Sequence, residues 1–252
     1  MIVAVSGAAG RMGSLVAQTI ADAPDMDLGP MYDPRAAGSS VAGVTIGDDP
    51  SALAEADAVV EFTEPDVVMG NLATWRSFSL HAVVGTSGFN AKRIAELREE
   101  WGSGPPNCLV VPNFSIGAVV MMRLSEIAAP HFAAAEVIEL HHDRKVDAPS
   151  GTAIATAERI AARAAQKRAV RSAELIAGAR GADAAGVPVH AVRLPGLVAH
   201  QQVLFGGVGE TLTIRHDTTD RSAFMPGVLA AIRAVATLPD PVTVGLESVL
   251  GI

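Results

Sequence analysis

The sequence predicts an α/β protein in two parts: a domain with a parallel sheet, followed by a smaller α+β domain with a mixed sheet. Three observations support this prediction. Short apolar runs alternate with helical patterns through the first half of the chain. Polar residues or glycines follow those runs directly, at the edge where a parallel sheet binds its ligands. In the second half, turn sequences separate three strand-like runs, which is typical of antiparallel hairpins.

The first half opens with residues 2–5, a continuous apolar run of the kind that forms a strand buried on both faces. The small and polar residues 36–47 are expected to form a surface loop. Further strands are expected at residues 27–32, 57–63, 81–86 and 108–111, and helices at residues 12–23, 67–78 and 91–101. Strands that are separated by helices predict parallel pairing.

The second half has a different pattern. Its expected strands are separated by turn sequences at residues 195–196 and 206–209. The strands are predicted at residues 189–194, 198–205 and 210–217, after an apolar run at residues 136–140. Helices are predicted at residues 116–132, 152–168 and 226–238, and a short strand at residues 242–246.

Three glycines, Gly7, Gly10 and Gly13, lie between the first strand and the first helix in the sequence GAAGRMG. Glycines let the backbone approach a pyrophosphate, and the helix N-terminus faces it. The order of strand, glycine turn and helix predicts a Rossmann-like opening that binds a dinucleotide. The spacing is G-x-x-G-x-x-G rather than the more common G-x-G-x-x-G, so a tight strand–helix turn without a nucleotide is the alternative.

The residues after the second strand bear on the choice of cofactor. Asp33 lies 20 residues beyond Gly13, where an acid accepts the ribose hydroxyls of NAD. Arg11 and Arg35 favour a 2′-phosphate instead, because a guanidinium binds phosphate well. The sequence therefore permits both NADH and NADPH. The alternative for Asp33 and Pro34 is a simple turn.

Composition and charge narrow the class of protein. Hydrophobic residues make up 49% of the chain and charged residues 18%, which is typical of a soluble globular protein. The net charge of −8 disfavours nucleic acid and anionic membranes as partners. No secretory signal or membrane-spanning run is evident. The single cysteine, Cys108, excludes an internal disulfide and indicates a reducing compartment, so we expect a cytoplasmic location.

Residues 138–153, IELHHDRKVDAPSGTA, combine groups that suit proton transfer to an anionic small molecule. His141 and His142 titrate near neutral pH, and Lys145 supplies a fixed positive charge. The helix expected after Ser150 offers N–H groups and a positive dipole end. The alternatives are a surface or core histidine pair and a Ser150 that only caps the helix. A metal site is not expected, because no third ligand stands at a recognisable spacing.

Taken together, the motifs resemble those of the 4-hydroxy-tetrahydrodipicolinate reductase family, also called dihydrodipicolinate reductases, of bacterial lysine biosynthesis. The family motif E-[LI]-H-H-x-x-K-x-D-A-P-S-G-T-A is complete at residues 139–153. The other matches are the glycine loop 7–13, the strand ends 61–63 and 85–88, the sequence 112–117 and the hairpin 209–216. Glu61 replaces the family's usual Asp, and Ser87 its usual Thr, and both keep the chemical type.

The resemblance implies a nucleotide-binding domain at residues 1–113, completed by about residues 218–252, and a substrate-binding domain at residues 114–217 that forms homotetramers. It implies NADH- or NADPH-dependent reduction of 4-hydroxy-tetrahydrodipicolinate, a small anionic dicarboxylate, to tetrahydrodipicolinate with loss of water. His141 would be the acid/base and Lys145 the proton donor. A substrate carboxylate would be held by His142, Ser150, Gly151 and Thr152. The cofactor would be held by Gly7, Ala8, Ala9, Gly10, Arg11, Met12 and Asp33, and on its nicotinamide side by Gly85, Thr86, Ser87, Val111, Pro112, Asn113 and Phe114. Another two-domain amino-acid dehydrogenase and a non-enzymatic nucleotide sensor are the alternatives.

Overall fold

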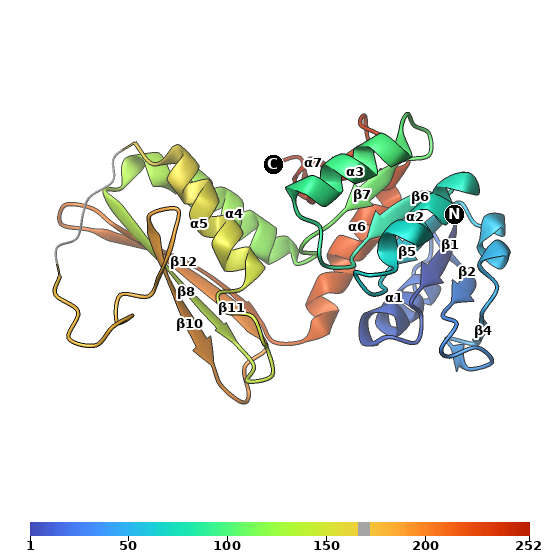
Figure 1. Ribbon diagram of the computed structural model, residues 1–252, viewed down its shortest axis with the longest axis horizontal. Coiled ribbons are helices and arrows are strands. Elements are labelled where there is room, and N and C mark those ends of the chain that lie inside the picture. The colour runs from blue at the N-terminus through green and yellow to red at the C-terminus, as the bar shows by residue number, and fades with distance from the viewer. Residues whose placement is uncertain (166–171) are drawn as a thin grey trace. The chain divides into compact units, whose positions relative to one another are not determined.

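The computed structural model of the protein describes residues 1–165 and 172–252 (Figure 1). The chain divides into two compact units, each with a sheet of its own. Unit 1 comprises Met1–Ser115 and Phe224–Gly251, and unit 2 comprises Ile116–Ala223. The short 3-10 helix η3 (Arg221–Phe224) lies where the chain returns to unit 1.

Unit 1 is built on an eight-stranded sheet with the order β13-β7-β6-β5-β1-β2-β4-β3. All neighbouring strands are parallel except β3 and β4. The strands are β1 (Ile2–Ser6), β2 (Asp27–Tyr32), β3 (Ser40–Val41), β4 (Val44–Gly47), β5 (Ala58–Glu61), β6 (His81–Val84), β7 (Cys108–Val110) and β13 (Val242–Val244). The predicted α/β class and parallel sheet are therefore confirmed.

The prediction of a surface loop at residues 36–47 is wrong, because this segment contains strands β3 and β4. Strand β4 extends the parallel sheet beside β2, where Ile46 is paired with Met31. Ile46 is 1% exposed, so one buried apolar side chain anchors a segment that is otherwise small and polar. A single apolar residue among glycines does not produce a detectable strand pattern in the sequence.

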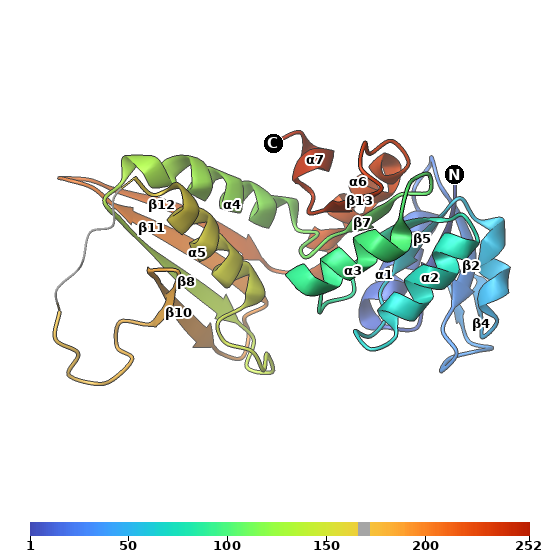
Figure 2. The ribbon, with the colours of Figure 1, turned by 45° about the horizontal axis from the view of Figure 1, so that its top comes forward.

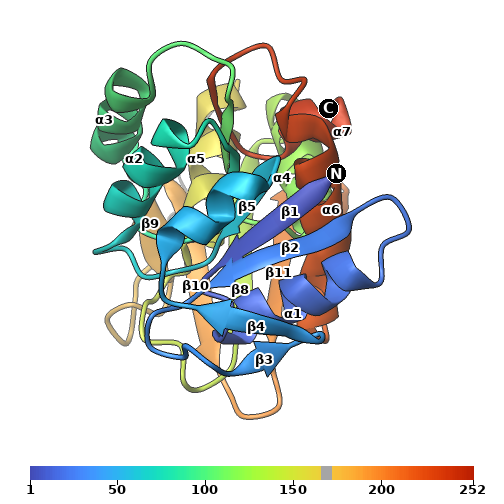
Figure 3. The ribbon, with the colours of Figure 1, turned by 90° about the vertical axis from the view of Figure 1, so that its right-hand side faces the viewer.

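Helices cover both faces of this sheet. In Figure 3, α2 (Val68–Ser77) and α3 (Ala91–Trp101) lie on one face, and α1 (Arg11–Ala21) and α6 (Met225–Val235) on the other. The core on the α2–α3 face includes Trp75, Leu97 and Trp101, all almost fully buried. The 3-10 helix η1 (Pro50–Glu55) and the short helix α7 (Glu247–Leu250) complete the unit.

Unit 2 contains a five-stranded mixed sheet with the order β12-β11-β8-β10-β9. The strands are β8 (Ala134–His141), β9 (Ala182–Ala184), β10 (Val187–Arg193), β11 (Ala199–Gly206) and β12 (Thr211–Thr218). β11 and β12 pair antiparallel across residues 206–211, which confirms the hairpin predicted at 206–209. β10 is parallel to β8, and β11 is antiparallel to it.

The hairpin predicted at residues 195–196 is wrong, because β10 and β11 do not pair with each other. β8 lies between them, so the turn passes over the end of β8. The reason is that β8 and β10 are joined through a helix, α5 (Gly151–Arg163), and a connection of this kind favours parallel pairing. This order places Arg193 of β10 and Ala199 of β11 on either side of His141.

One face of the unit 2 sheet is covered by α4 (Ile116–Ala128) and α5 (Gly151–Arg163), which lie side by side in Figures 1 and 2. The 3-10 helix η2 (Ala129–His131) follows α4. The core between helices and sheet includes Val137, Ala157, Ile160, Val203 and Phe205. α5 ends at Arg163, and its predicted end at Arg168 lies outside the described residues. No helix in the described part of the chain is long and apolar enough to cross a bilayer.

Candidate functional site

The glycine loop of unit 1 brings backbone against backbone. Gly7 follows β1 with a φ of +77°, and a Cβ there would lie 2.4 Å from the carbonyl oxygen of Phe62. A Cβ on Gly13 would lie 2.1 Å from the carbonyl oxygen of Gly7, so α1 packs directly on the loop. Gly10 is the N-cap of α1 and offers no side-chain hydrogen bond to the helix. The first N–H groups of α1 therefore form an anion site of the kind that a pyrophosphate fits.

Asp33 lies beside this loop, as its position in the sequence predicts. Its Oδ2 accepts a hydrogen bond from the Ala9 N–H at 3.2 Å, and its Oδ1 accepts one from the Arg35 N–H at 3.3 Å. The Arg35 guanidinium pairs with Glu64 at 2.8 Å. Asp33, Arg35 and Glu64 line a pocket of about 360 Å³ within unit 1, together with Gly7, Gly10, Tyr32, Pro34, Phe62, Thr63, Val67 and Asn71. The second predicted phosphate-binding arginine, Arg11, is not among the residues that line this pocket.

The ends of β5, β6 and β7 meet around two aromatic rings. The rings of Phe62 and Phe114 lie 5.6 Å apart between centroids, and a Cβ on Gly85 would overlap the Phe62 ring at 2.1 Å. The buried hydroxyl of Thr86 accepts a hydrogen bond from the Thr63 N–H at 2.9 Å. Among the other predicted residues here, Val111 is buried, whereas Ser87 and Pro112 are exposed.

The partners of Glu61, the fully buried carboxylate at the end of β5, could not be recognised in the sequence. The Thr63 hydroxyl and the Asn71 amide donate to its Oε1, the latter at 3.1 Å. The Trp75 Nε1–H donates to its Oε2 at 2.8 Å. Glu61 thus positions two pocket-lining side chains, Thr63 and Asn71. The signal was present in the sequence as a carboxylate at the end of an apolar strand, but two of its partners, Asn71 and Trp75, lie on helix α2, ten and fourteen residues later.

In unit 2, a second buried carboxylate organises the predicted catalytic segment. Glu139 of β8 is fully buried. Its oxygens accept hydrogen bonds from both terminal nitrogens of Arg193, at 2.8 Å each, and from the Ser150 N–H at 3.1 Å. His141 Nδ1 lies 2.5 Å from its Oε2. Glu139 therefore joins the end of β8, the end of β10 and the start of α5. Arg193 was not singled out from the sequence.

The charges in this cluster shift the pKa values of its members. Burial alone raises the pKa of Glu139, but the hydrogen bonds from Arg193 and His141 outweigh burial and hold it below its usual value. Burial lowers the pKa of His141, and the hydrogen bond to Glu139 only partly offsets this. The positive charges of Lys145 and Arg193 lower it further. At neutral pH the cluster therefore contains an ionised carboxylate and a neutral imidazole.

Lys145 and His142 follow in a turn after β8. The Lys145 N–H donates to the His142 carbonyl oxygen at 3.2 Å. The Lys145 Nζ donates to both carboxylate oxygens of Asp147 at 2.8 Å, and this hydrogen bond lowers the pKa of Asp147. His142 Nδ1 is buried and has no hydrogen-bond partner among the described residues. An orphaned buried nitrogen of this kind is consistent with a ligand that completes the site.

The N-terminus of α5 lies next to this cluster. Ser150 is its N-cap, and its hydroxyl accepts a hydrogen bond from the Ala153 N–H at 3.2 Å. A Cβ added at Gly151 would meet no atom within 4 Å, so space is open beside the first residue of the helix. The structure thus brings His141 and Ser150 together through Glu139. No group of three or more metal-binding side chains occurs among the described residues.

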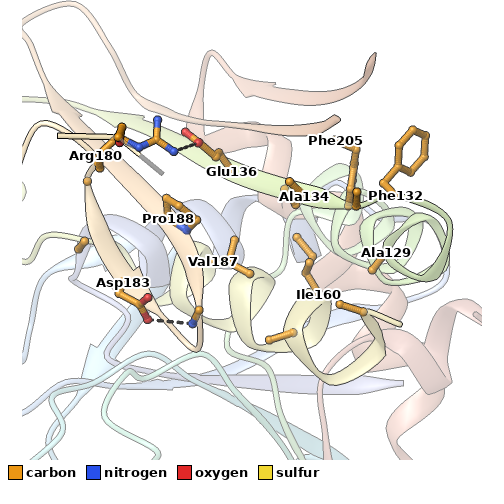
Figure 4. A pocket seen from close by; sticks show the side chains of 18 of the residues that line it. Ala129, Phe132, Ala134, Glu136, Ile160, Arg180, Asp183, Val187, Pro188 and Phe205 are labelled. Atoms are coloured by element: carbon orange, nitrogen blue, oxygen red, sulfur yellow. Dashed lines mark hydrogen bonds and ion pairs between the residues drawn. The ribbon is translucent and has the colours of Figure 1, made fainter. Parts of the chain in front are cut away.

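A larger pocket, of about 430 Å³, lies elsewhere in unit 2 and contains none of the predicted site residues (Figure 4). Phe132, Phe205 and Ile160 form its apolar part, and the charged pair Arg180–Glu136 lies on its wall. The pocket extends to Ala164 and Ser172, on either side of the residues that are not described. We therefore assign no function to it.

A parallel-sheet unit with a glycine loop between its first strand and helix, in one chain with a second unit that has a His–Lys segment and a capped helix N-terminus, defines a two-domain oxidoreductase that depends on a nicotinamide nucleotide. Comparison with known proteins agrees. Residues 1–114 match the N-terminal domain of dihydrodipicolinate reductases and residues 117–250 match the C-terminal domain, so the chain belongs to the dihydrodipicolinate reductase family.

Whole proteins support the same assignment. The chain is 50% identical to the 4-hydroxy-tetrahydrodipicolinate reductase of Cutibacterium acnes, over 99% of this chain and 98% of that protein. It is 48% identical to the enzyme of Mycobacterium marinum over the whole of both chains, 100% of each. A solved structure of dipicolinate-bound dihydrodipicolinate reductase from Paenisporosarcina sp. TG-14 is similar, with a TM-score of 0.86 and 35% identity over 98% of both chains.

The family confirms the class of activity predicted from the sequence. Its members are NAD(P)H-dependent oxidoreductases of lysine and diaminopimelate biosynthesis, and the N-terminal domain binds the nucleotide. Neither of the alternatives, another amino-acid dehydrogenase or a nucleotide sensor, is favoured.

Proposed function

We propose that this chain reduces 4-hydroxy-tetrahydrodipicolinate to tetrahydrodipicolinate, with loss of water, in the cytoplasm. The observation that carries the proposal is the buried Glu139, which gathers His141 and the start of α5 around one carboxylate. Dipicolinate, a small dicarboxylate, is bound by the related protein from Paenisporosarcina sp. TG-14. A dicarboxylate of this size suits the positive helix end and the adjacent Lys145.

The nucleotide has a matching cradle in unit 1. The loop of residues 7–12 holds the pyrophosphate, with the first N–H groups of α1, at Arg11 and Met12, facing it, and Asp33 accepts the ribose hydroxyls. The residues at 85–87 and 111–114 line the nicotinamide side. When bound, the nicotinamide supplies the hydride. The glycines at positions 7 and 13 support this assignment, because a side chain at Gly7 would collide with the Phe62 carbonyl oxygen and one at Gly13 with the Gly7 carbonyl oxygen.

The substrate carboxylate is held by His142, Ser150, Gly151 and Thr152. Ser150 fixes the helix end through its cap, and the open space beside Gly151 admits the carboxylate. Addition of a hydride leaves electron density on the substrate, which must then be protonated. Lys145 donates this proton and His141 acts as the acid/base, close enough for its pKa to sense the charge of Lys145.

The test is NADH or NADPH consumption when the purified protein meets the coupled product of pyruvate and aspartate semialdehyde. We expect consumption that dipicolinate inhibits, as expected of a dicarboxylate that occupies the substrate position. The control is the same assay without aspartate semialdehyde, which measures NAD(P)H oxidation that does not depend on the substrate. A well-folded protein that binds NADH and consumes none would overturn the proposal.

We also propose that four copies assemble through the uncovered face of the unit 2 sheet. Side chains alternate between the two faces of a sheet along each strand, and Val137 and Val203 point into the core. The register therefore places four apolar residues on the other face: Ile138, Leu140, Val192 and Leu204. Light scattering should give the mass of four chains. Leu204→Lys should shift the mass downward, whereas Glu99→Lys, an exposed change on α3, should not. A monomeric wild-type protein would contradict this part of the proposal.

A further inference from the structure

Strand β8 carries two clusters of the same composition. Glu139 holds His141 and Arg193, and Glu136 holds His190 and Arg180. The two carboxylates are three residues apart, and each accepts from one imidazole and one guanidinium. Only the Glu139 cluster also contacts the start of α5, through the Ser150 N–H. Glu136 and Arg180 lie on the wall of the pocket in Figure 4. The Glu136 cluster can therefore serve as an internal control, because it has the same three types of side chain but lies outside the candidate active site.

The hydrogen bonds that Glu139 accepts determine which ring nitrogen of His141 carries the hydrogen. The carboxylate is fully buried and accepts from Arg193 twice and from Ser150 once. An ionised carboxylate can only accept hydrogen bonds, so the 2.5 Å contact with His141 requires a hydrogen on Nδ1. A neutral imidazole carries one hydrogen, which leaves a lone pair on Nε2.

We infer that Glu139 is a positioning residue that holds His141 in the Nδ1–H tautomer, so that Nε2 is the atom that exchanges a proton at the substrate. The inference deepens the proposed function and rests on it for the identity of the substrate. Arg193 has a part in the same arrangement. It neutralises the buried carboxylate and donates to the carbonyl oxygen of Asp147 at 2.7 Å, which ties the Lys145–Asp147 turn to the same carboxylate.

The protonation state agrees with this geometry. The charged groups that face His141 are Glu139 on its own strand, Arg193 on β10 and Lys145 in the following turn. Burial and the two cations lower the His141 pKa and outweigh Glu139, so the ring is neutral at neutral pH. The neutral ring can then accept a proton at Nε2 without giving up the Nδ1 hydrogen bond that orients it.

The test is the tautomer of His141, measured by ¹⁵N NMR of histidine-labelled protein as a function of pH. The wild-type ring should carry its hydrogen on Nδ1 at neutral pH. In Glu139→Gln, the new amide N–H would donate to Nδ1 and shift the hydrogen to Nε2. We expect kcat to fall about 100-fold or more, the scale of acid–base catalysis, with unchanged NADH affinity. Glu139→Asp should keep the Nδ1–H tautomer and recover part of kcat.

Glu136→Gln is the matched control. It makes the same change in a His–Glu–Arg cluster on the same strand, so it should alter the His190 signals and leave the His141 tautomer and kcat unchanged. A wild-type His141 with its hydrogen on Nε2 would overturn the inference. So would a Glu139→Gln variant with near-normal kcat. If Glu139→Gln does not fold, the wild-type tautomer and Glu139→Asp decide. If the tautomer is as inferred and the protein consumes no NAD(P)H, the proposed function fails while the positioning role holds.

Discussion

Lys145 lies near enough to His141 for its charge to lower the pKa of the ring, but the two side chains are held by different carboxylates. His141 contacts the buried Glu139, whereas Lys145 pairs with the exposed Asp147. The Asp147 side chain is 58% exposed, so it can move away from Lys145 when an anionic ligand enters. We therefore propose that Lys145 exchanges its Asp147 partner for a carboxylate of the substrate, whereas Glu139 keeps His141 fixed.

We expect Lys145→Met to lower kcat about 100-fold or more, because it removes the proton donor. NADH affinity should stay unchanged, since the nucleotide site lies in unit 1. Lys92→Met is the control, because Lys92 lies exposed on α3 of the other unit. Steady-state kinetics and NADH fluorescence would measure both effects. Near-normal kcat in Lys145→Met would remove Lys145 from the mechanism.

Arg35 is the residue on which we expect cofactor preference to depend. It lines the nucleotide pocket and pairs with Glu64 across a distance of 2.8 Å. Arg35→Ala should reduce kcat/KM for NADPH by about 10-fold or more, the scale of one charged contact, and change the value for NADH little. Glu64→Gln should favour NADPH, because it frees the guanidinium and removes a negative charge. Arg98→Ala, on α3, is the control. Equal losses with both cofactors after Arg35→Ala would contradict this role.

Individual site residues were predictable where they lie in one continuous segment. The sequence identified His141, Lys145 and Ser150 because they lie within ten residues of one another. It did not reveal Arg193, which meets Glu139 only because β10 pairs with β8 in a register that puts Arg193 opposite His141. Asn71 was missed for the same reason, since it reaches Glu61 through packing of α2. Long-range pairing leaves no mark in a local pattern.

At the scale of elements, a glycine in α1 and a glycine in α2 occupy equivalent positions in different surroundings. Gly13 and Gly70 are each the third residue of their helix. A Cβ on Gly13 would lie 2.1 Å from the Gly7 oxygen, whereas a Cβ on Gly70 would meet no atom within 4 Å. Close contact between α1 and the nucleotide loop therefore requires a glycine at position 13, whereas the space around Gly70 of α2 would admit a side chain.

Gly13→Ala should destabilise unit 1 by about 1–3 kcal/mol, as overpacking does, and weaken NADH binding because it displaces the loop. Gly70→Ala should stabilise the unit by up to about 1 kcal/mol, the difference in helix propensity between the two residues. Denaturant unfolding and NADH titration would measure both variants. Tight NADH binding by Gly13→Ala would show that α1 can move away from the loop without cost to the site.

Elements were predictable where their apolar pattern was continuous. Apart from β3 and β4, the strands of unit 1 follow directly from it, as does the hairpin of β11 and β12. The order of strands in unit 2 did not, because the turn at 195–196 has the composition of a hairpin but must cross the end of β8. The sequence of a turn describes local backbone geometry and contains no information about which strand occupies the place between its neighbours.

At the scale of the molecule, the tryptophans and the histidines are distributed unequally between the two units. Both tryptophans, Trp75 and Trp101, are buried in unit 1. Of the seven histidines in the sequence, only His81 belongs to unit 1. Burial lowers the pKa of His81, and its Nδ1 accepts a hydrogen bond from the Asn107 N–H at 3.0 Å. Protonation of His81 would break that hydrogen bond and leave the Asn107 N–H without its acceptor.

The pH dependence of unit 1 stability therefore has a defined sign. The pKa of His81 is lower in the folded chain than its value of about 6.5 in the unfolded chain. As the pH falls through that value, the unfolded chain binds protons that the folded chain does not, so the free energy of unfolding decreases. Stability should be fully retained above about pH 7.5 and should decline below about pH 6.5.

Tryptophan fluorescence during urea unfolding, repeated between about pH 5.5 and 8, would measure this decline for unit 1 alone. His81→Gln should flatten it, because the amide oxygen keeps an acceptor for the Asn107 N–H and does not titrate in this range. His131→Gln, in unit 2, should leave the decline as in the wild type. A fluorescence midpoint that is independent of pH in the wild-type protein, or that still falls with pH in His81→Gln, would show that His81 does not govern the acid sensitivity of the nucleotide-binding unit.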